Sequence, residues 1–320
     1  MNDELIRLLE NNFEQKVLYM EKINGGWLSD KWRIVFDDYD VMVKIIANKK
    51  IMRRNIQIEK AAMLLRLLNT LDIKCPKIYM INEKLVNYNE LGNPIVVIEY
   101  FKDTYSKEFF NITREEMYDL GLELGNMENI LNNINNKTEL EYKKVLKKMN
   151  IEYDKRVIAG KRNNNNKFLQ DVYKQKIIID SLTDKFFENL KIGYCHGDLS
   201  QDNILFDKNG LKAIIDFEIT NISYTIQDIG RIFLTFCLDN NGKINKQLVD
   251  ALLKGYNKNN KANIQDIIDG IRVIWCLEVN LWSKEEYYTD HNPTKVEKFI
   301  YEINWITDNW FKLEEIIQLE

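Results

Sequence analysis

The feature that most constrains the fold of this 320-residue chain is the segment YCHGDLSQDNILFDKNGLKAIIDF, residues 194–217. It contains two short β-branched runs, NILF and LKAIID, which are separated by the turn residues of 207–210. This pattern predicts a tight hairpin. Pairing of the two strands would return Asp216, at the end of the second strand, to the loop that contains Asp198 and Asn203. Three oxygen-bearing side chains are therefore expected at one edge of a small sheet.

Asp198 and Asn203 belong to the pattern H-x-D-x-x-x-x-N, which starts at His196. The same spacing, followed by a second Asp, forms the catalytic loop of protein kinases. A hydroxyl that attacks a phosphoryl group needs an acceptor for its proton, and a triphosphate needs a metal ion held by hard oxygen ligands. We therefore expect Asp198 to be a catalytic base, and Asn203 and Asp216 to bind Mg²⁺. Turn formation alone explains Asp, Asn and Gly in a hairpin, but not this spacing together with His196 and Asp216.

The motifs CHGDLSQDNILF and IIDFE resemble those of the aminoglycoside phosphotransferase and choline kinase superfamily, whose members are relatives of protein kinases. Gly197 stands where protein kinases have Arg, and Glu218 stands where a Gly would complete D-F-G; both departures are typical of the small-molecule kinases. The resemblance implies a protein-kinase-like, two-lobed α+β fold. It also implies that Asp228, in IQDIGRIF, supports the catalytic loop together with His196 and does not react.

Residues 17–101 consist of short β-branched and aromatic runs around one helical stretch. The runs KVLYMEKI, KWRIVF, DVMVKII, KIYMINEK and PIVVIEYF predict a five-stranded antiparallel sheet. Residues 51–71 contain no Gly or Pro and place apolar residues at helical spacing, so one helix should pack against that sheet. The expected first domain is a nucleotide-binding lobe at 1–101.

After Asp103 the pattern becomes mainly helical, with the hairpin in the middle. Thr113 and Glu116 form a capping box that predicts a helix from Thr113 to about Leu131. The expected second domain is a catalytic and acceptor-binding lobe at 102–320.

The resemblance assigns nucleotide contacts to the first lobe. Lys44 lies in VMVKII on the third predicted strand, where a kinase-like fold has the lysine that contacts the α- and β-phosphates. Glu59, on the predicted helix, is expected as its ion-pair partner. The loop NGGWLSDK would cover the phosphates through Gly25, Gly26 and Ser29, although its spacing is one residue longer than the usual G-G-x-S.

The run IVVIEYF is expected to link the two lobes, and the backbone from Glu99 to Phe101 would meet the purine. Backbone contacts leave no side-chain signature, so the choice between ATP and GTP stays open at this point.

Acidic residues are concentrated near the C-terminus. Residues 274–320 contain four Lys and ten Asp or Glu, a net charge of −6, whereas the whole chain carries −4. Acidic helices with aromatic faces favour a cationic acceptor; the alternative is that the aromatic residues are core and the carboxylates are solvated. The candidate acceptor contacts are Glu218, Glu278, Trp275 and Trp282. The last three share one face of the helix expected over 266–283.

Composition excludes several other classes of protein. A net charge of −4 and a pI near 5.6 argue against a nucleic-acid-binding surface. The four cysteines are scattered without a C-x-x-C pair and there are two histidines, so neither a zinc site nor a disulfide framework is supported. No apolar run approaches the ~20 residues of a membrane span, and the N-terminus lacks the order of a signal peptide. We therefore expect a cytoplasmic protein without a membrane partner.

Three functions are compatible with these features. The first is a kinase for an aminoglycoside-like compound or an amino alcohol, and the second is a metabolic kinase for choline, homoserine or a similar compound. The third is a structural spore-coat protein that keeps the kinase fold without activity. A structural scaffold has no physical need for Lys44, Asp198, Asn203 and Asp216 together, which argues against the third. The acceptor and the oligomeric state stay open.

Overall fold

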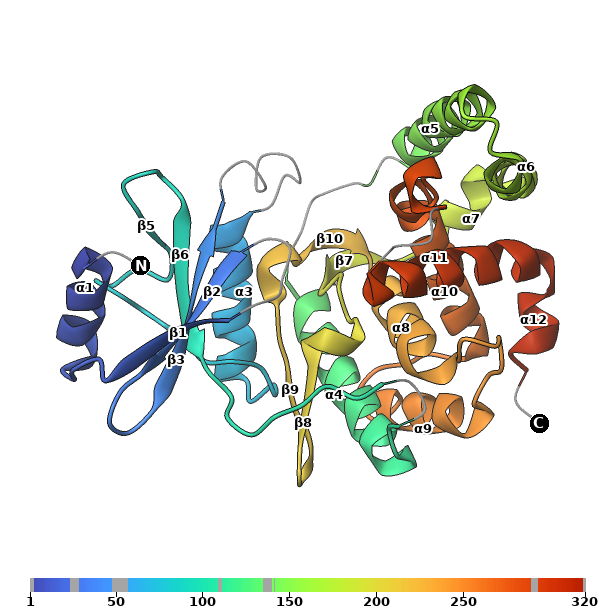
Figure 1. Ribbon diagram of the computed structural model, residues 1–320. Helices are drawn as coiled ribbons and strands as arrows, with labels where there is room; N and C mark the ends of the chain where they lie inside the picture. The colour runs from blue at the N-terminus through green and yellow to red at the C-terminus, as the bar shows by residue number, and fades with distance from the viewer. Residues whose placement is uncertain are drawn as a thin grey trace. The chain divides into compact units, whose positions relative to one another are not determined.

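The computed structural model describes residues 3–23, 29–47, 57–108, 111–134, 140, 142–288 and 293–318. The chain forms two compact units (Figure 1). The first unit combines Met1–Lys107 with Asp202–Asn221, and the second combines Glu108–Gln201 with Ile222–Glu320. The two expected lobes are therefore present, but a segment from the middle of the chain belongs to the first of them.

Within the described residues, the first unit contains a six-stranded antiparallel sheet in the order β1-β2-β3-β6-β4, with β5 also paired to β6. The strands are β1 (Tyr19–Ile23), β2 (Ser29–Val35), β3 (Asp40–Ile46), β4 (Ile78–Tyr79), β5 (Asn87–Tyr88) and β6 (Pro94–Glu99). The five strands expected from the sequence are confirmed. The sixth, β5, has two residues and is too short to produce a periodic pattern.

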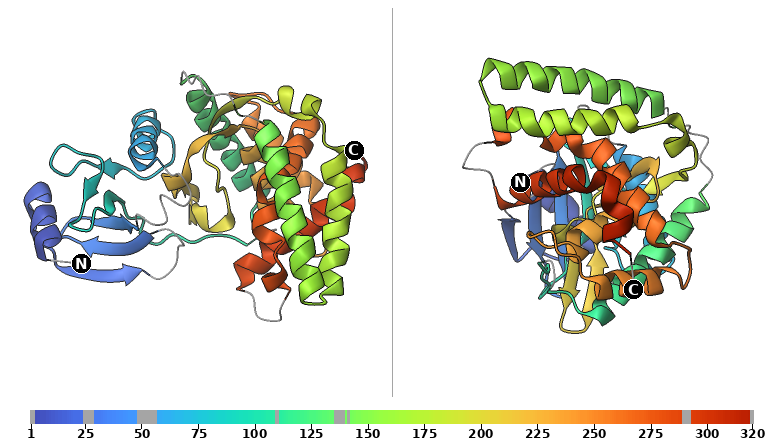
Figure 2. Two further views of the ribbon diagram at one scale, coloured as in Figure 1. Left: turned by 90° about the horizontal axis from the view of Figure 1, so that it is seen from above. Right: turned by 90° about the vertical axis from the view of Figure 1, so that its right-hand side faces the viewer.

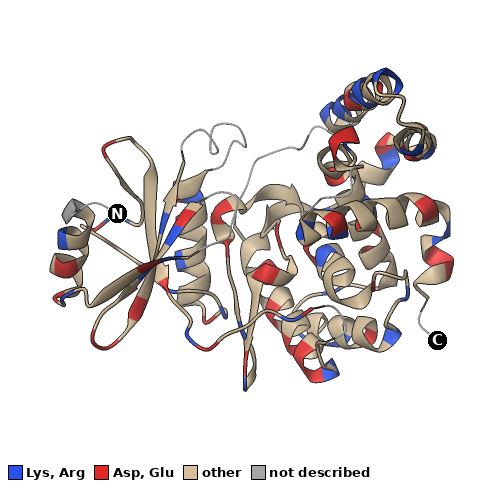
Figure 3. Ribbon diagram, viewed as in Figure 1, with Lys and Arg blue, Asp and Glu red and all other residues tan. Residues whose placement is uncertain are grey.

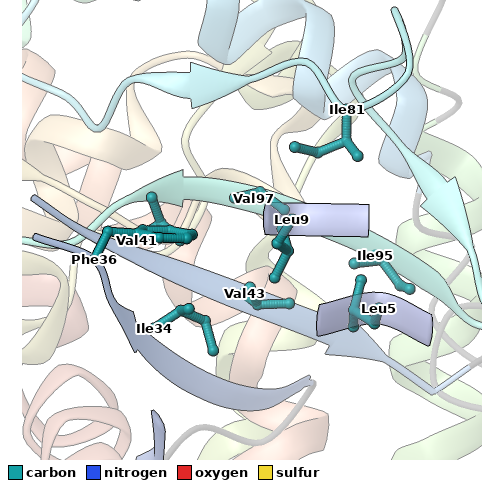
Figure 4. Packing of buried hydrophobic residues seen from close by; sticks show 9 residues of the cluster. All are labelled: Leu5, Leu9, Ile34, Phe36, Val41, Val43, Ile81, Ile95 and Val97. Atoms are coloured by element: carbon teal, nitrogen blue, oxygen red, sulfur yellow. The ribbon is translucent and has the colours of Figure 1, made fainter. Parts of the chain in front are cut away.

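Alternation of side chains along the strands gives this sheet two buried faces. Val43 of β3 and Val97 of β6 point to the face covered by α1 (Asp3–Phe13), where they pack with Leu5 and Leu9 (Figure 4). On the other face lies α3 (Ile58–Thr70), which buries six residues. The helix expected over 51–71 is confirmed from Ile58 onward, and residues 51–56 lie outside the described part of the chain.

The predicted hairpin is formed by β8 (Ile204–Asp207) and β9 (Gly210–Ile214), with Ile204 opposite Ile214. It is held in the first unit by backbone hydrogen bonds. The N–H of Ile214 donates to the carbonyl of Lys74 at 2.8 Å, and Tyr105 and Phe206 exchange two such bonds at 3.0 and 2.9 Å. The short helix η2 (Phe217–Ile219) packs against α3. Because these bonds join segments far apart in sequence, the expected division after residue 101 differs from the observed one.

The second unit is mainly helical. Its α-helices are α4 (Arg114–Asn132), α5 (Tyr142–Arg162), α6 (Asn166–Ser181), α7 (Asp184–Glu188), α8 (Gln227–Ile232), α9 (Lys246–Tyr256), α10 (Ile264–Trp282), α11 (Thr294–Asn309) and α12 (Leu313–Ile316). The short strands β7 (Ile192–Cys195) and β10 (Asn221–Tyr224) pair with each other. Helices α5 and α6 lie side by side (Figure 2). The capping box of Thr113 and Glu116 is present at the start of α4, as predicted.

Helix α8 packs directly on α10 through two glycines. A Cβ added to Gly230 of α8 would lie 2.5 Å from the carbonyl carbon of Gly270, and one added to Gly270 would lie 2.3 Å from the carbonyl oxygen of Ile226. Both distances are shorter than any real contact of a Cβ atom, so the backbones can approach this closely only because both residues are glycine. This packing fixes α8, which contains Asp228 and Arg231.

Two further expectations concern the chain as a whole. All four cysteines lie in the described part, where they are buried and free. None of the described helices has the length and apolar character needed to cross a membrane.

Candidate active site

Asp216 lies at the end of β9, where the backbone has the left-handed values φ 68° and ψ 54°. Aspartate adopts this conformation more readily than most residues. Its carboxylate meets two lysines of the same unit. Lys31 Nζ lies 2.9 Å from Oδ2 and 3.3 Å from Oδ1, and Lys44 Nζ contacts Oδ1. Burial alone would raise the pKa of Asp216, but the two ammonium groups hold that pKa well below its usual range.

Lys44 is the most buried charged group of this cluster, with 4% of its side chain exposed. Its second acidic partner is Glu218, whose Oε1 lies 2.5 Å from Nζ. Burial alone would lower the pKa of Lys44. The carboxylates of Asp216 and Glu218 have the larger effect and raise that pKa. Asp216 and Lys44 are in direct contact.

The expected ion pair between Lys44 and Glu59 is wrong. Glu59 is exposed on α3 and accepts a hydrogen bond from Tyr88, which raises the pKa of Tyr88 to about 12. The position of the predicted partner is taken by Glu218, because η2 packs against α3 and brings its own carboxylate to Lys44. Glu218 therefore faces the lysine, and its expected role as an acceptor contact stays a prediction.

Lys31 was not singled out in the sequence. The signal that could have found it is the register of the β2–β3 hairpin, in which Lys31 lies directly opposite Lys44. Residues directly opposite each other in antiparallel strands point to the same face.

A pocket lies beside Lys44 in the first unit. Its polar end is formed by Lys44, Asp216 and Glu218, and its walls are apolar residues of α3, β4 and β6. Two of these, Val96 and Ile98, come from the strand that precedes the expected purine contacts.

The other predicted nucleotide contacts are only partly described. Ser29 is buried at the start of β2, whereas Gly25 and Gly26 lie outside the described residues. The N–H of Glu99 already donates to the carbonyl of Lys77 at 2.8 Å, and the carbonyl of Phe101 accepts from Thr104 Oγ1 at 3.3 Å. The purine contact of the 99–101 backbone stays a prediction.

Asp228 of α8 holds the loop that contains Asp198 in place. The backbone N–H groups of His196 and Gly197 donate to the two carboxylate oxygens of Asp228 at 2.7 and 3.0 Å. Gly197 has φ 80°, a value that favours glycine. The N–H of Asp198 donates to His196 Nδ1 at 3.2 Å. Asp228 is 1% exposed, so it can position the loop but cannot meet a substrate.

Asn203 and Asp216 have the donor chemistry that Mg²⁺ prefers. Asn203 is buried. Its backbone carbonyl accepts a hydrogen bond at 2.9 Å from the backbone N–H of Ile215, the residue before Asp216. The two residues thus lie at neighbouring positions of the hairpin. No group of three or more His, Cys, Asp or Glu side chains that could hold a metal is present in the described part of the chain. Mg²⁺ is commonly held by one or two protein ligands together with substrate phosphates and water.

The expected acceptor site around Glu278 is wrong. Trp275 is fully buried in the second unit, where it packs on Trp310 and donates to Thr307. Trp282 stacks on Phe299 at 4.6 Å. Helix α10 is apolar around most of its circumference. Residues at helical spacing on this helix therefore do not have to lie on a face that is open to solvent.

Glu278 is neutralised by a buried arginine. Arg231 Nη2 lies 2.5 Å from Glu278, and Nη1 lies 2.7 Å from Glu302. Burial alone would lower the pKa of Arg231, but the two carboxylates raise it. Other C-terminal carboxylates pair in the same way, such as Asp308 with Lys174 and Glu314 with Arg272. Figure 3 shows Lys and Arg interspersed with Asp and Glu over these helices, so the acidity counted along the sequence does not form a free acidic face.

Comparisons with known proteins concern the family and the fold of the chain. The model of the phosphotransferase enzyme family (APH) matches residues 20–260. A homoserine kinase of Sinorhizobium fredii is 31% identical over 101 residues, which cover 31% of this chain and 31% of that enzyme. The chain thus matches less than a third of the length of the curated relatives.

Two solved structures share the fold over nearly the whole chain. Spectinomycin phosphotransferase APH(9)-Ia, solved with ADP and spectinomycin, has a TM-score of 0.62 at 14% identity and covers 98% of this chain and 99% of its own. Choline kinase LicA from Streptococcus pneumoniae has a TM-score of 0.62 at 15% identity, with coverages of 96% and 100%. At these identities the likeness concerns the fold alone.

Proposed function

Because the chain belongs to the phosphotransferase enzyme family, we propose that it transfers the γ-phosphate of ATP or GTP to a hydroxyl group of a small molecule. The observation that carries this proposal is the contact between Lys44 and Asp216, which are 172 residues apart in sequence and lie in one compact unit. A buried lysine beside a carboxylate that suits Mg²⁺ is the arrangement that a metal-bound triphosphate requires.

In the proposed reaction, each of these residues has a separate role. Asp198 accepts the proton of the acceptor hydroxyl while the hydroxyl oxygen forms a bond to the γ-phosphorus. The bond from that phosphorus to the β,γ-bridging oxygen breaks, and the nucleoside diphosphate leaves. Lys44 balances the negative charge of the phosphates. Mg²⁺, when bound, supplies further positive charge at the phosphate oxygens, and Asn203 and Asp216 would hold it.

The acceptor is proposed to be a small hydroxyl compound that also contains an amino or ammonium group, such as an aminoglycoside or an amino alcohol. A second candidate is a metabolic kinase for homoserine or choline. The specific observation that favours homoserine is the 31% identity to a homoserine kinase over 101 residues.

The test is a screen of ATP and GTP, each with Mg²⁺, against aminoglycosides, choline, ethanolamine and homoserine. Release of nucleoside diphosphate should require both Mg²⁺ and an acceptor. An aminoglycoside or ethanolamine as that acceptor supports the first candidate, and homoserine or choline supports the second. Release that is equally fast with and without every acceptor would contradict a small-molecule kinase.

A further inference from the structure

We propose that Lys31 is a second phosphate-binding lysine, which acts beside Lys44 on the triphosphate of the bound nucleotide. The inference rests on the proposed function, because it takes the ligand of the first unit to be a nucleotide. It assigns to Lys31 a role that neither the kinase-type motif nor the position of Lys44 requires.

The first argument is the register of the sheet. Lys31 of β2 and Lys44 of β3 are directly opposite each other, and both ammonium groups reach the carboxylate of Asp216. Like charges at directly opposed positions destabilise a sheet. Two lysines at such positions therefore require an anion that both can share.

The second argument is burial. The side chain of Lys31 is 15% exposed and that of Lys44 is 4% exposed. Withdrawal of an ammonium group from water is costly unless the group is paired. The two lysines face two carboxylates, Asp216 and Glu218, so their charges balance.

The third argument is what changes when a nucleotide and its metal bind. Asp216 is then needed as a metal ligand, so its carboxylate is shared with a dication and is no longer available to neutralise two lysines. The triphosphate brings the replacement negative charge. A lysine ammonium is a compact point charge that is well suited to phosphate oxygens.

Lys31 is also correctly placed along its strand. Ser29, which is predicted to contact the phosphates, begins β2 and lies two residues before Lys31. Residues two apart in a strand point to the same face. Ser29 and Lys31 of β2 and Lys44 of β3 therefore lie on one face of the hairpin.

The experiment measures equilibrium binding of ATP, ADP, AMP and adenosine, with Mg²⁺, to the full chain and to four variants, of which Lys44→Met tests the proposed function itself. Lys31→Met removes the charge and Lys31→Arg keeps it. Lys22→Met is the matched control, because Lys22 lies on the neighbouring strand β1, is 50% exposed and pairs with Asp30. Loss of a charge-assisted hydrogen bond should raise the Kd of ATP roughly 10- to 100-fold in Lys31→Met. Adenosine should bind unchanged, Lys31→Arg should restore most of the affinity for ATP, and the control should match the original protein.

The inference is overturned if Lys31→Met changes the Kd of ATP no more than that of adenosine, because Lys31 would then only neutralise Asp216. Failure of the proposed function looks different: the original protein would bind ATP no more tightly than adenosine, and Lys44→Met would have no effect. A thermal melt without nucleotide comes first. If Lys31→Met does not fold, Lys31→Gln, which can still hydrogen-bond to Asp216, replaces it with the same expected loss of affinity.

Discussion

Replacement of Glu218 by Gln tests which carboxylate neutralises the buried lysine. Lys44 Nζ lies 2.5 Å from Glu218, and the two side chains are 4% and 14% exposed. Complete loss of a partner from a buried ion pair costs about 3–5 kcal/mol. In Glu218→Gln the cost is smaller, because Asp216 remains and the amide oxygen of Gln can still accept a hydrogen bond. A charge-assisted bond, worth about 1.5–3 kcal/mol, becomes a neutral one of about half that strength, so we expect a loss of about 0.7–1.5 kcal/mol.

The assay is urea unfolding of the nucleotide-free protein, with Glu59→Gln as the matched substitution. Glu59 is exposed and bonds to Tyr88, so its replacement should change the free energy of unfolding by less than about 0.5 kcal/mol. Equal losses in the two variants, or a larger loss in Glu59→Gln, would refute the assignment of Glu218 as the partner of Lys44.

Three further predictions concern the second unit. In Asp228→Asn, one carboxylate oxygen that accepts a loop N–H becomes an NH₂ group. We expect kcat to fall at least about tenfold and the Kd of ATP to stay unchanged. A parallel change in kcat and Kd would contradict a positioning role for Asp228. Gly270→Ala forces α8 away from α10, so thermal unfolding should show a loss of about 1–3 kcal/mol or more. An unchanged Tm would contradict the close packing. Burial lowers the pKa of Lys298 in spite of the nearby Glu302. The unfolded chain therefore binds more protons here, and stability relative to Lys298→Met should rise as the pH increases toward the ordinary lysine pKa of about 10.4. A difference that does not change with pH would contradict this.

Local patterns in the sequence were sufficient for the hairpin and for the strands. The β8–β9 turn, the capping box at Thr113 and the strand that contains Lys44 are all specified by residues within a few positions of one another. The loop support by Asp228 was also predicted, from the resemblance, and its two hydrogen bonds agree with that prediction. From the sequence, the amphipathic N-terminal segment was described only as lacking the order of a signal peptide. In the structure it forms α1, which covers one face of the sheet.

The misassigned residues all depend on contacts between distant segments. The partner of Lys44 is decided by the packing of η2 on α3, which the order of residues along the chain does not specify. Trp275 and Glu278 share a helical face, but the arginine that neutralises Glu278 comes from α8. Net charge counted over 274–320 likewise omitted the cations that other helices supply.

Phosphate transfer from ATP to the acceptor identified in the screen is the measurement that decides the function. Phosphorus NMR of a mixture with ATP and Mg²⁺ should show ADP and a new phosphate ester in equal amounts, and only when the acceptor is present. Asp198→Ala should lower turnover roughly 10²- to 10⁴-fold, the usual contribution of a positioned general base, and should leave the affinity for ATP nearly unchanged. Full turnover in Asp198→Ala, or ADP formed without an ester of the acceptor, would contradict the assignment of this chain as a kinase with Asp198 as its base.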